Sequence, residues 1–137
     1  MTKTEILDFI NAHPASHVAT VEGNKPHVRG LQIHKADESG IIIQVWKIKD
    51  IHEQLQANPE MEICFNDYGA GVQVRVSGRA ELLEDMGLKK QVVEERPFMK
   101  PMVESKGYDA VALYRLKGRA TVWTRETNFE PKTYIDL

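Results

Sequence analysis

The stretch VWKIKD, residues 45–50, places two lysines where a helix is expected to begin. Lys47 and Lys49 alternate after an apolar run, and Asp50 is a residue type that caps helices. Free backbone amides and the positive end of the helix dipole would add to the charge of the lysines. Such a junction could hold a phosphate monoester. Two solvated lysines on a loop are the alternative interpretation.

Arg29 is the second residue whose type and position could do chemistry. It lies between Val28 and Gly30 in a stretch with strand-like alternation, so its guanidinium should emerge on one face of a sheet. There it could bind an anionic or electron-rich ligand, and Gly30 would let a planar group lie close to the backbone. Gly30 also suggests a β-bulge. An ordinary surface arginine is the alternative interpretation.

The other reactive side chains predict neither a metal site nor a hydrolase. None of the five histidines has the short paired spacing of a zinc site, and Cys64 has no second cysteine to support one. No serine or cysteine lies in a nucleophile-elbow context, and Cys64 has the apolar neighbours of an inert core thiol.

Length and charge restrict the class of protein further. The chain has 137 residues, which predicts a single domain over 1–137. A net charge of −2 gives nucleic acid no electrostatic reason to bind, and no apolar run approaches the ~20 residues of a membrane span. The single cysteine and an amphipathic, acidic N-terminus without a signal-peptide pattern predict a cytoplasmic protein.

Helix signals occur at three places along the chain. Thr2 and Glu5 have the spacing of a capping box at the start of a first helix. Asp50 is the expected N-cap of a second helix, and Asp85 that of a third. The proline-containing stretch 97–107 is expected to be irregular.

Strands account for most of the remaining chain. In VQVRVSGRAE, which begins at Val72, valines alternate with polar residues such as Gln73 and Arg75, as in a strand with one buried face. Tight turns separate six or seven such stretches, and the last two are predicted to form a closing hairpin at Gly118. The prediction is an α+β, mainly β domain: a six-stranded antiparallel barrel with short flanking helices. A β-sandwich is the competing geometry. The expected strands are 16–22, 27–35, 41–46, 60–67, 72–83, 109–117 and 119–124.

Two segments carry large apolar side chains that a lone chain would struggle to bury. One is the stretch around Phe98, Met99 and Met102, and the other is the tail 125–137. We therefore expect a partner surface, most economically a second copy of the chain. The tail's apolar residues are Phe129, Tyr134, Ile135 and Leu137.

The order of these landmarks resembles the flavin-binding split-barrel family typified by pyridoxamine 5′-phosphate oxidase. ATVEGNKPHVRGL (19–31) is similar to the family pattern A-T-x-x-x-G-x-P-x-V-R, and the second helix closes on L-x-x-N-P (55–59). VQVRVSGRAE (72–81) is similar to the family's Q-V-R-V-x-G-x-A/V-E strand. The resemblance covers roughly positions 4 to 124.

This resemblance implies a homodimer that binds flavin mononucleotide (FMN) in two clefts at the subunit interface, with the tail 125–137 packed at that interface. The leading expectation is an FMN-dependent oxidoreductase. A dimer that binds flavin, deazaflavin or haem without turnover is the alternative. Arg29 would contact the cofactor, Gln44 to Trp46 would line the flavin edge, and the two loop lysines would lie by the phosphate. The implied cofactor-binding residues are Arg29, His34, Gln44, Val45, Trp46, Lys47, Lys49 and Gln73.

The chain departs from the family pattern at positions that normally hold the phosphate. Val45 and Trp46 stand where threonine or serine is common, and Ile51 stands where lysine is common. Each hydrogen bond lost to a charged phosphate is worth ~1.5–3 kcal/mol. Compensation by Lys47 and Lys49, weaker FMN binding and a changed ligand are the three alternatives. The oxidase's C-terminal substrate-binding pattern is absent, so pyridoxamine phosphate oxidation is not expected.

Overall fold

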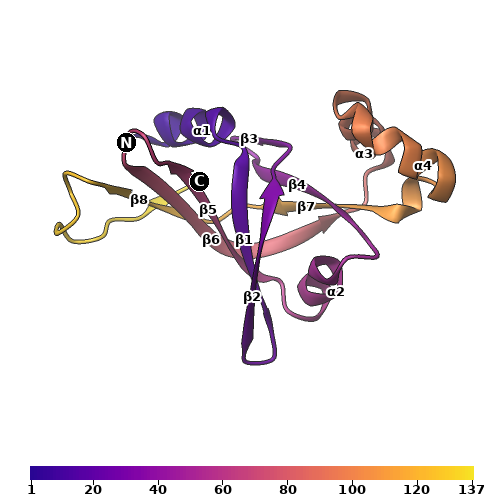
Figure 1. The fold of residues 1–137 in the computed structure, drawn as a ribbon, viewed down its shortest axis with the longest axis horizontal. Helices are drawn as coiled ribbons and strands as arrows, with labels where there is room; N and C mark the ends of the chain where they lie inside the picture. The colour runs from indigo at the N-terminus through magenta and orange to yellow at the C-terminus, as the bar shows by residue number, and fades with distance from the viewer.

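The structure, a computed structural model, describes residues 1–137 and consists of nine strands with four short α-helices (Figure 1). The helices are α1 (Lys3–Ala12), α2 (Asp50–Ala57), α3 (Met86–Glu95) and α4 (Lys100–Lys106). The strands are β1 (Ala15–Glu22), β2 (Lys25–Gln32), β3 (Lys35–Asp37), β4 (Gly40–Trp46), β5 (Glu60–Asp67), β6 (Val72–Leu83), β7 (Val111–Leu116), β8 (Arg119–Thr124) and β9 (Ile135–Asp136).

The strands form two antiparallel ladders that share the long strand β6. One runs β2-β1-β5-β6-β8-β9, and the other runs β6-β7-β4-β3. No ladder joins β2 to β4, so the barrel is open along that side. The α+β, mainly β split barrel is thus confirmed. The short strands β3 and β9 come in addition to the seven stretches that alternation indicates.

The predicted hairpin at Gly118 is wrong. Strands β7 and β8 do not pair with each other: β7 pairs with Ala80–Leu83 of β6, and β8 pairs with Val72–Ser77. The chain instead crosses between the two ladders at Gly118, where a Cβ would overlap the carbonyl oxygen of Ser77. Alternation around a glycine looks the same for a hairpin and for such a crossing, so the sequence does not distinguish them.

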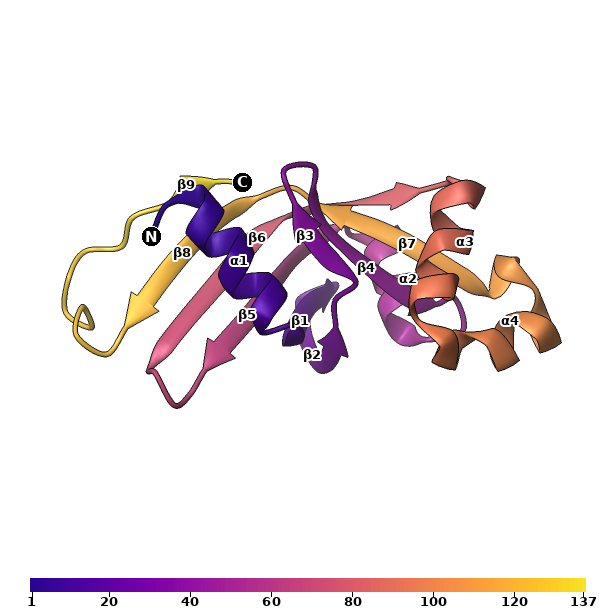
Figure 2. The same ribbon diagram turned by 90° about the horizontal axis from the view of Figure 1, so that it is seen from above.

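The core lies between the two ladders, and α1 lies across one side of the sheet (Figure 2). Val74 and Val76 of β6 are 0% exposed, as their alternation predicts. The polar residues between them lie on the outer face of the sheet. There Gln73 Nε2 donates to Asn66 Oδ1 at 2.9 Å, and Arg75 lies 3.6 Å from the Glu62 carboxylate.

The helix caps follow the sequence at two of the three predicted places. Thr2 and Glu5 form the capping box of α1, and Asp85 Oδ1 accepts from Leu88 N at 3.0 Å to cap α3. The prediction for Asp50 is wrong, because the N-cap of α2 is Lys49 and Asp50 is already helical. The carboxylate of Asp50 is therefore not used as a cap.

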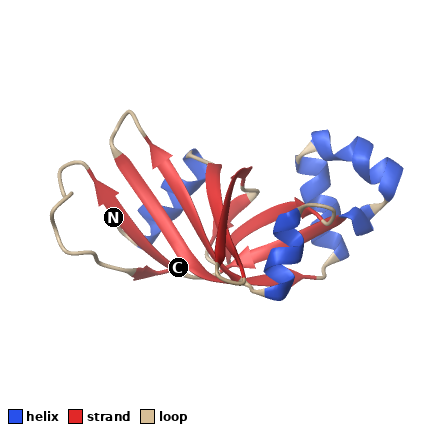
Figure 3. Cartoon of the chain, turned by 60° about the horizontal axis from the view of Figure 1, so that its bottom comes forward, coloured by secondary structure: helices blue, strands red, loops and turns tan.

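The stretch 97–107 is not irregular. It contains a short 3₁₀ turn and α4, because a proline is compatible with the first turn of a helix. Met99 is 1% exposed in a second apolar cluster with Val92, Val93 and residues of β7, which contradicts its expected exposure. Phe98, at 64% exposed, follows the expectation. In Figure 3 these helices stand together at one end of the sheet.

The C-terminal tail returns to the chain's own sheet. Ile135 pairs with Ala120 of β8, and Leu137 N donates to Gly118 O at 2.9 Å. Leu137 is buried, whereas Phe129 is 98% exposed. Placement of the tail against a second copy stays a prediction. None of the helices combines the length and the apolar composition that crossing a bilayer requires.

Candidate cofactor-binding site

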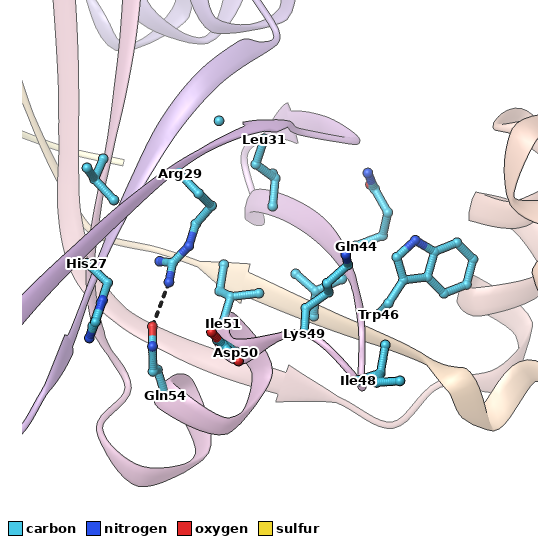
Figure 4. A pocket seen from close by; sticks show the side chains of 13 residues that line it. His27, Arg29, Leu31, Gln44, Trp46, Ile48, Lys49, Asp50, Ile51 and Gln54 are labelled. Carbon is cyan, nitrogen blue, oxygen red and sulfur yellow. Dashed lines mark hydrogen bonds between the residues drawn. The ribbon is translucent and has the colours of Figure 1, made fainter.

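A pocket of about 640 Å³ opens at the side of the barrel where β2 and β4 are not paired. Strand β2 supplies one wall, the end of β4 supplies the other, and α2 with the residues before it closes the base (Figure 4). Ligand pockets of roughly 300–1,000 Å³ accept drug-sized molecules, so a planar heterocycle fits this volume. The opening in the barrel is therefore also its most evident binding site.

Arg29 lies in the wall of this pocket, and two uncharged side chains hold its guanidinium. Nη1 donates to Thr20 Oγ1 at 2.7 Å, and Nη2 donates to Gln54 Oε1 at 2.6 Å. Thr20 also donates to Gln54 Oε1, so the three side chains form one network. Thr20 is 1% and Gln54 6% exposed, so two buried side chains hold the guanidinium of Arg29 in position.

The guanidinium of Arg29 forms no ion pair with a carboxylate. Burial lowers its pKa, and the negative charge of Asp50 partly opposes this shift. An arginine nevertheless remains protonated at neutral pH. The pocket therefore holds an oriented positive charge with N–H donors left over, because a guanidinium has five. This arrangement suits an electron-rich or anionic group of a ligand.

Gln44 offers an unused acceptor in the opposite wall. Its Nε2 donates to Gln32 O at 3.1 Å, but its Oε1 is buried without a hydrogen-bond partner. A buried acceptor left unpaired costs about 1–3 kcal/mol, and a ligand N–H or O–H could recover this free energy once the amide turns toward the pocket. The imide N–H of an isoalloxazine ring is a donor of this kind, so a flavin fits the donors and acceptors of the pocket.

The beginning of α2 is the exposed end of the pocket. Lys49 caps the helix with its backbone alone: its carbonyl oxygen accepts from His52 N at 3.1 Å, and no side chain caps the amides before His52, which remain open. Lys49 and Asp50 are exposed and line the pocket, and Ile51 is buried beneath them. Trp46 borders the pocket while packing against the second apolar cluster, so it does not fill the cavity.

The structure brings together five of the residues that the family resemblance implies, and three lie elsewhere in the chain. His34 Nε2 lies 3.0 Å from the Glu95 carboxylate, and its side chain is 6% exposed. Lys47 lines a separate cavity with Lys89, and Gln73 lies on the outer face of the sheet. The five residues that line the pocket are Arg29, Gln44, Val45, Trp46 and Lys49.

Sequence reasoning missed the two residues that hold Arg29. Thr20 lies two residues from Val18, the cross-strand partner of Arg29, so it is a diagonal neighbour on the same face. Gln54 lies one helical turn after Asp50 on α2, whose first residue differs from the prediction by one position. Strand alternation is the signal that could have found Thr20, but nothing in the sequence indicates that Gln54 points at β2.

Comparison with known proteins gives the family of the chain. A scan of protein families matches residues 2–120 to the family described as pyridoxamine 5′-phosphate oxidase. The chain belongs to the pyridoxamine 5′-phosphate oxidase family. A search of curated proteins finds no match to this chain.

Solved structures share the fold of this pyridoxamine 5′-phosphate oxidase family member at low identity. A NimC/NimA family protein of Clostridium acetobutylicum is 23% identical over 98% of this chain and 92% of its own, with a TM-score of 0.78. A conserved hypothetical protein of Mycobacterium tuberculosis is 20% identical over 100% and 93%, with a TM-score of 0.74. An FAD-binding protein of Mesorhizobium loti is 18% identical over 84% and 88%, with a TM-score of 0.64. At these identities the likeness concerns the fold.

Proposed function

We propose that the chain is a homodimeric, FMN-dependent oxidoreductase that binds FMN in the pocket between β2, β4 and α2. The observation that carries this proposal is the oriented guanidinium of Arg29, which has no carboxylate partner in the wall of a cavity of about 640 Å³. Membership of a family named for an oxidase and a fold shared with an FAD-binding protein support it. The substrate class is an unidentified small molecule.

The residues of the pocket divide the work of binding. Gln44 Oε1 would accept from the imide edge of the ring, and Arg29 would donate to its electron-rich atoms. Lys49 and the first amides of α2 would face the phosphate. When bound, the isoalloxazine ring supplies hydride or electron transfer, while the protein supplies orientation and electrostatics. The fixed positive charge of Arg29 would favour negative charge on that ring.

We propose that a second copy packs on the outer face of the sheet and brings Gln73 toward its partner's pocket. This face carries exposed apolar side chains, among them Val28 at 70% and Trp123 at 40% exposed. We also propose that the tail 125–137 packs at this interface. His34 and Lys47 remain proposed cofactor-binding residues. Light scattering on a size-exclusion column should give the mass of a dimer. Trp123→Arg should give a monomer, and a wild-type monomer would contradict the proposal.

The experiment that tests FMN binding is the visible spectrum of the purified protein, followed by titration with FMN. FMN should co-purify with the protein and give the flavin absorbance band, or the band should appear after FMN is added. One FMN should be bound per chain. An unchanged spectrum and no saturable quenching of flavin fluorescence would contradict the proposal. We also propose a cytoplasmic location, which the single free cysteine, Cys64, supports.

A second candidate function is binding of a flavin or another planar cofactor, such as a deazaflavin or haem, without turnover. The apolar side chains Val45, Trp46 and Ile51 favour it, because they border the pocket and offer no hydrogen bond to a phosphate except the indole N–H of Trp46. Mass spectrometry of the co-purified molecule identifies the cofactor. Oxidation of reduced nicotinamide by the loaded protein would favour the oxidoreductase, and its absence with every tested donor would favour the binding protein.

A further inference from the structure

The carboxylate of Asp50 lies at the end of the pocket where a flavin phosphate would be held. Asp50 is the first residue of α2 and lines the pocket beside Lys49 and Ile51 (Figure 4). It forms no ion pair and caps no helix, so its charge is not neutralised by a bonded partner. Burial lowers the pKa of the Arg29 guanidinium, and the negative charge of this carboxylate partly opposes that shift, so the charge of Asp50 acts inside the pocket.

The two ends of the pocket differ in how firmly they are built. At the ring end, Arg29 rests on Thr20 and Gln54, both buried, and Gln44 has a buried acceptor to offer. At the other end every residue from Lys47 to Asp50 is exposed, with no side-chain hydrogen bond at the N-terminus of α2. Exposed charges contribute little because water and salt screen them, so the attraction of Lys49 for a phosphate is weak.

A phosphate dianion at this end would meet opposing charges. Lys49 and the open amides of α2 attract it, and the Asp50 carboxylate in the same wall repels it. A ligand with an uncharged side chain in place of the phosphate would avoid the repulsion and keep every contact at the ring end.

We propose that Asp50 is a specificity-determining residue that cancels the contribution of the phosphate, so that the pocket recognises the isoalloxazine ring and binds riboflavin about as tightly as FMN. This inference rests on the proposed function, because it concerns the same pocket. The class of ligand is thus a flavin, read through its ring rather than through its phosphate.

The test measures dissociation constants of FMN and riboflavin by fluorescence quenching at low ionic strength, for the wild type and two variants. In Asp50→Asn the carboxylate is removed, and FMN should bind about fivefold tighter while riboflavin changes less than about twofold. Glu53→Gln is the matched control: Glu53 lies in the same first turn of α2 but lines a different cavity. It should leave both dissociation constants within about twofold of the wild type.

The outcomes separate this inference from the proposed function. In the wild type the two dissociation constants should agree within about threefold, as cancelling exposed charges require. If riboflavin binds saturably but FMN binds more than about tenfold tighter, the inference fails and the flavin site stands. Equal effects of Asp50→Asn and Glu53→Gln would also overturn it. If neither flavin binds, both proposals fail. Circular dichroism checks that the variants are folded.

Discussion

Two half-buried arginines, Arg29 and Arg96, lie in different parts of the molecule. They share the properties that usually mark an arginine as a candidate for ligand binding. Burial lowers the pKa of both, and neither forms an ion pair with a carboxylate. They differ in what surrounds them. Arg29 borders an open pocket and is held by side chains from β1 and α2.

Arg96 instead closes a helix onto the sheet. It is the C-cap of α3, its Nη1 donates to Ile33 O at 3.2 Å, and its guanidinium lies 5.0 Å from the centre of the Phe98 ring. Its Nε is buried without a partner, but it lines none of the main pockets. Burial and a shifted pKa therefore do not identify the binding arginine. The open cavity beside Arg29 is what distinguishes it as the proposed binding residue, whereas Arg96 holds the end of α3 against the sheet.

The largest expected effect is on FMN binding in Arg29→Met. Losing one or two charge-assisted hydrogen bonds should weaken FMN binding by about 10- to 100-fold. The melting temperature should change little, because Thr20 and Gln54 remain hydrogen-bonded to each other. Fluorescence titration and a thermal melt measure the two quantities. An unchanged dissociation constant would remove the distinction between the two arginines.

A smaller effect is expected from Gln54→Glu, which keeps Arg29 but gives it a carboxylate partner. The new ion pair should neutralise the guanidinium and weaken FMN binding by about tenfold, while the fold is kept. Gln56→Glu makes the same change of charge at an exposed position of α2 outside the pocket, and should leave binding unchanged. Equal titration curves for the two variants would contradict a pocket role for the Arg29 charge.

Arg96→Met should produce the opposite result to Arg29→Met. It removes the bond to Ile33 O and the contact with Phe98, which together are worth about 1–2 kcal/mol of unfolding free energy. The dissociation constant for FMN should stay within about twofold of the wild type. Urea denaturation and titration measure both. A tenfold loss of FMN binding would show that α3 belongs to the site.

The smallest expected effect is the pH dependence of stability that arises from His34, which lies beside Glu95 of α3. Burial lowers the pKa of His34, as do the charges of Arg96 and Lys35, while Glu95 opposes the shift. The unfolded chain therefore takes up a proton first, near its ordinary pKa of about 6.5, so stability should fall as pH drops below about 7. Melting temperatures across pH 7.5 to 5.5 measure the fall. In His34→Gln it should be shallower, and an identical slope would contradict the assignment.

Much of the fold could be predicted because alternation and caps are local signals. The valines of β6 and the cap at Asp85 lie as the sequence indicates. The crossing at Gly118 could not be predicted, since whether two strands pair with each other or with a third depends on the whole sheet. Helix α4 could not be predicted from its proline, because a proline breaks the interior of a helix but is compatible with the first turn, where this one lies.

The site could be predicted only in part, for a similar reason. The family resemblance leads to Arg29, Gln44 and Lys49, which all line the pocket. The hydrogen bond from Arg29 to the buried Gln54 depends on how α2 packs against β1, and no residue of either element indicates that packing. Of the proposed contacts, Gln73 lies on the outer face of its own chain, so a contact of Gln73 with the pocket requires a second chain.

The most direct test of a flavin site beside Arg29 is a crystal structure of the protein grown with FMN. The account predicts a ring between β2 and β4, with its imide nitrogen within about 3 Å of Gln44 Oε1 and a ring acceptor at a similar distance from the Arg29 guanidinium. Flavin density beside Arg96 and α3 would contradict it, as would crystals grown with saturating FMN in which the opening between β2 and β4 holds no flavin.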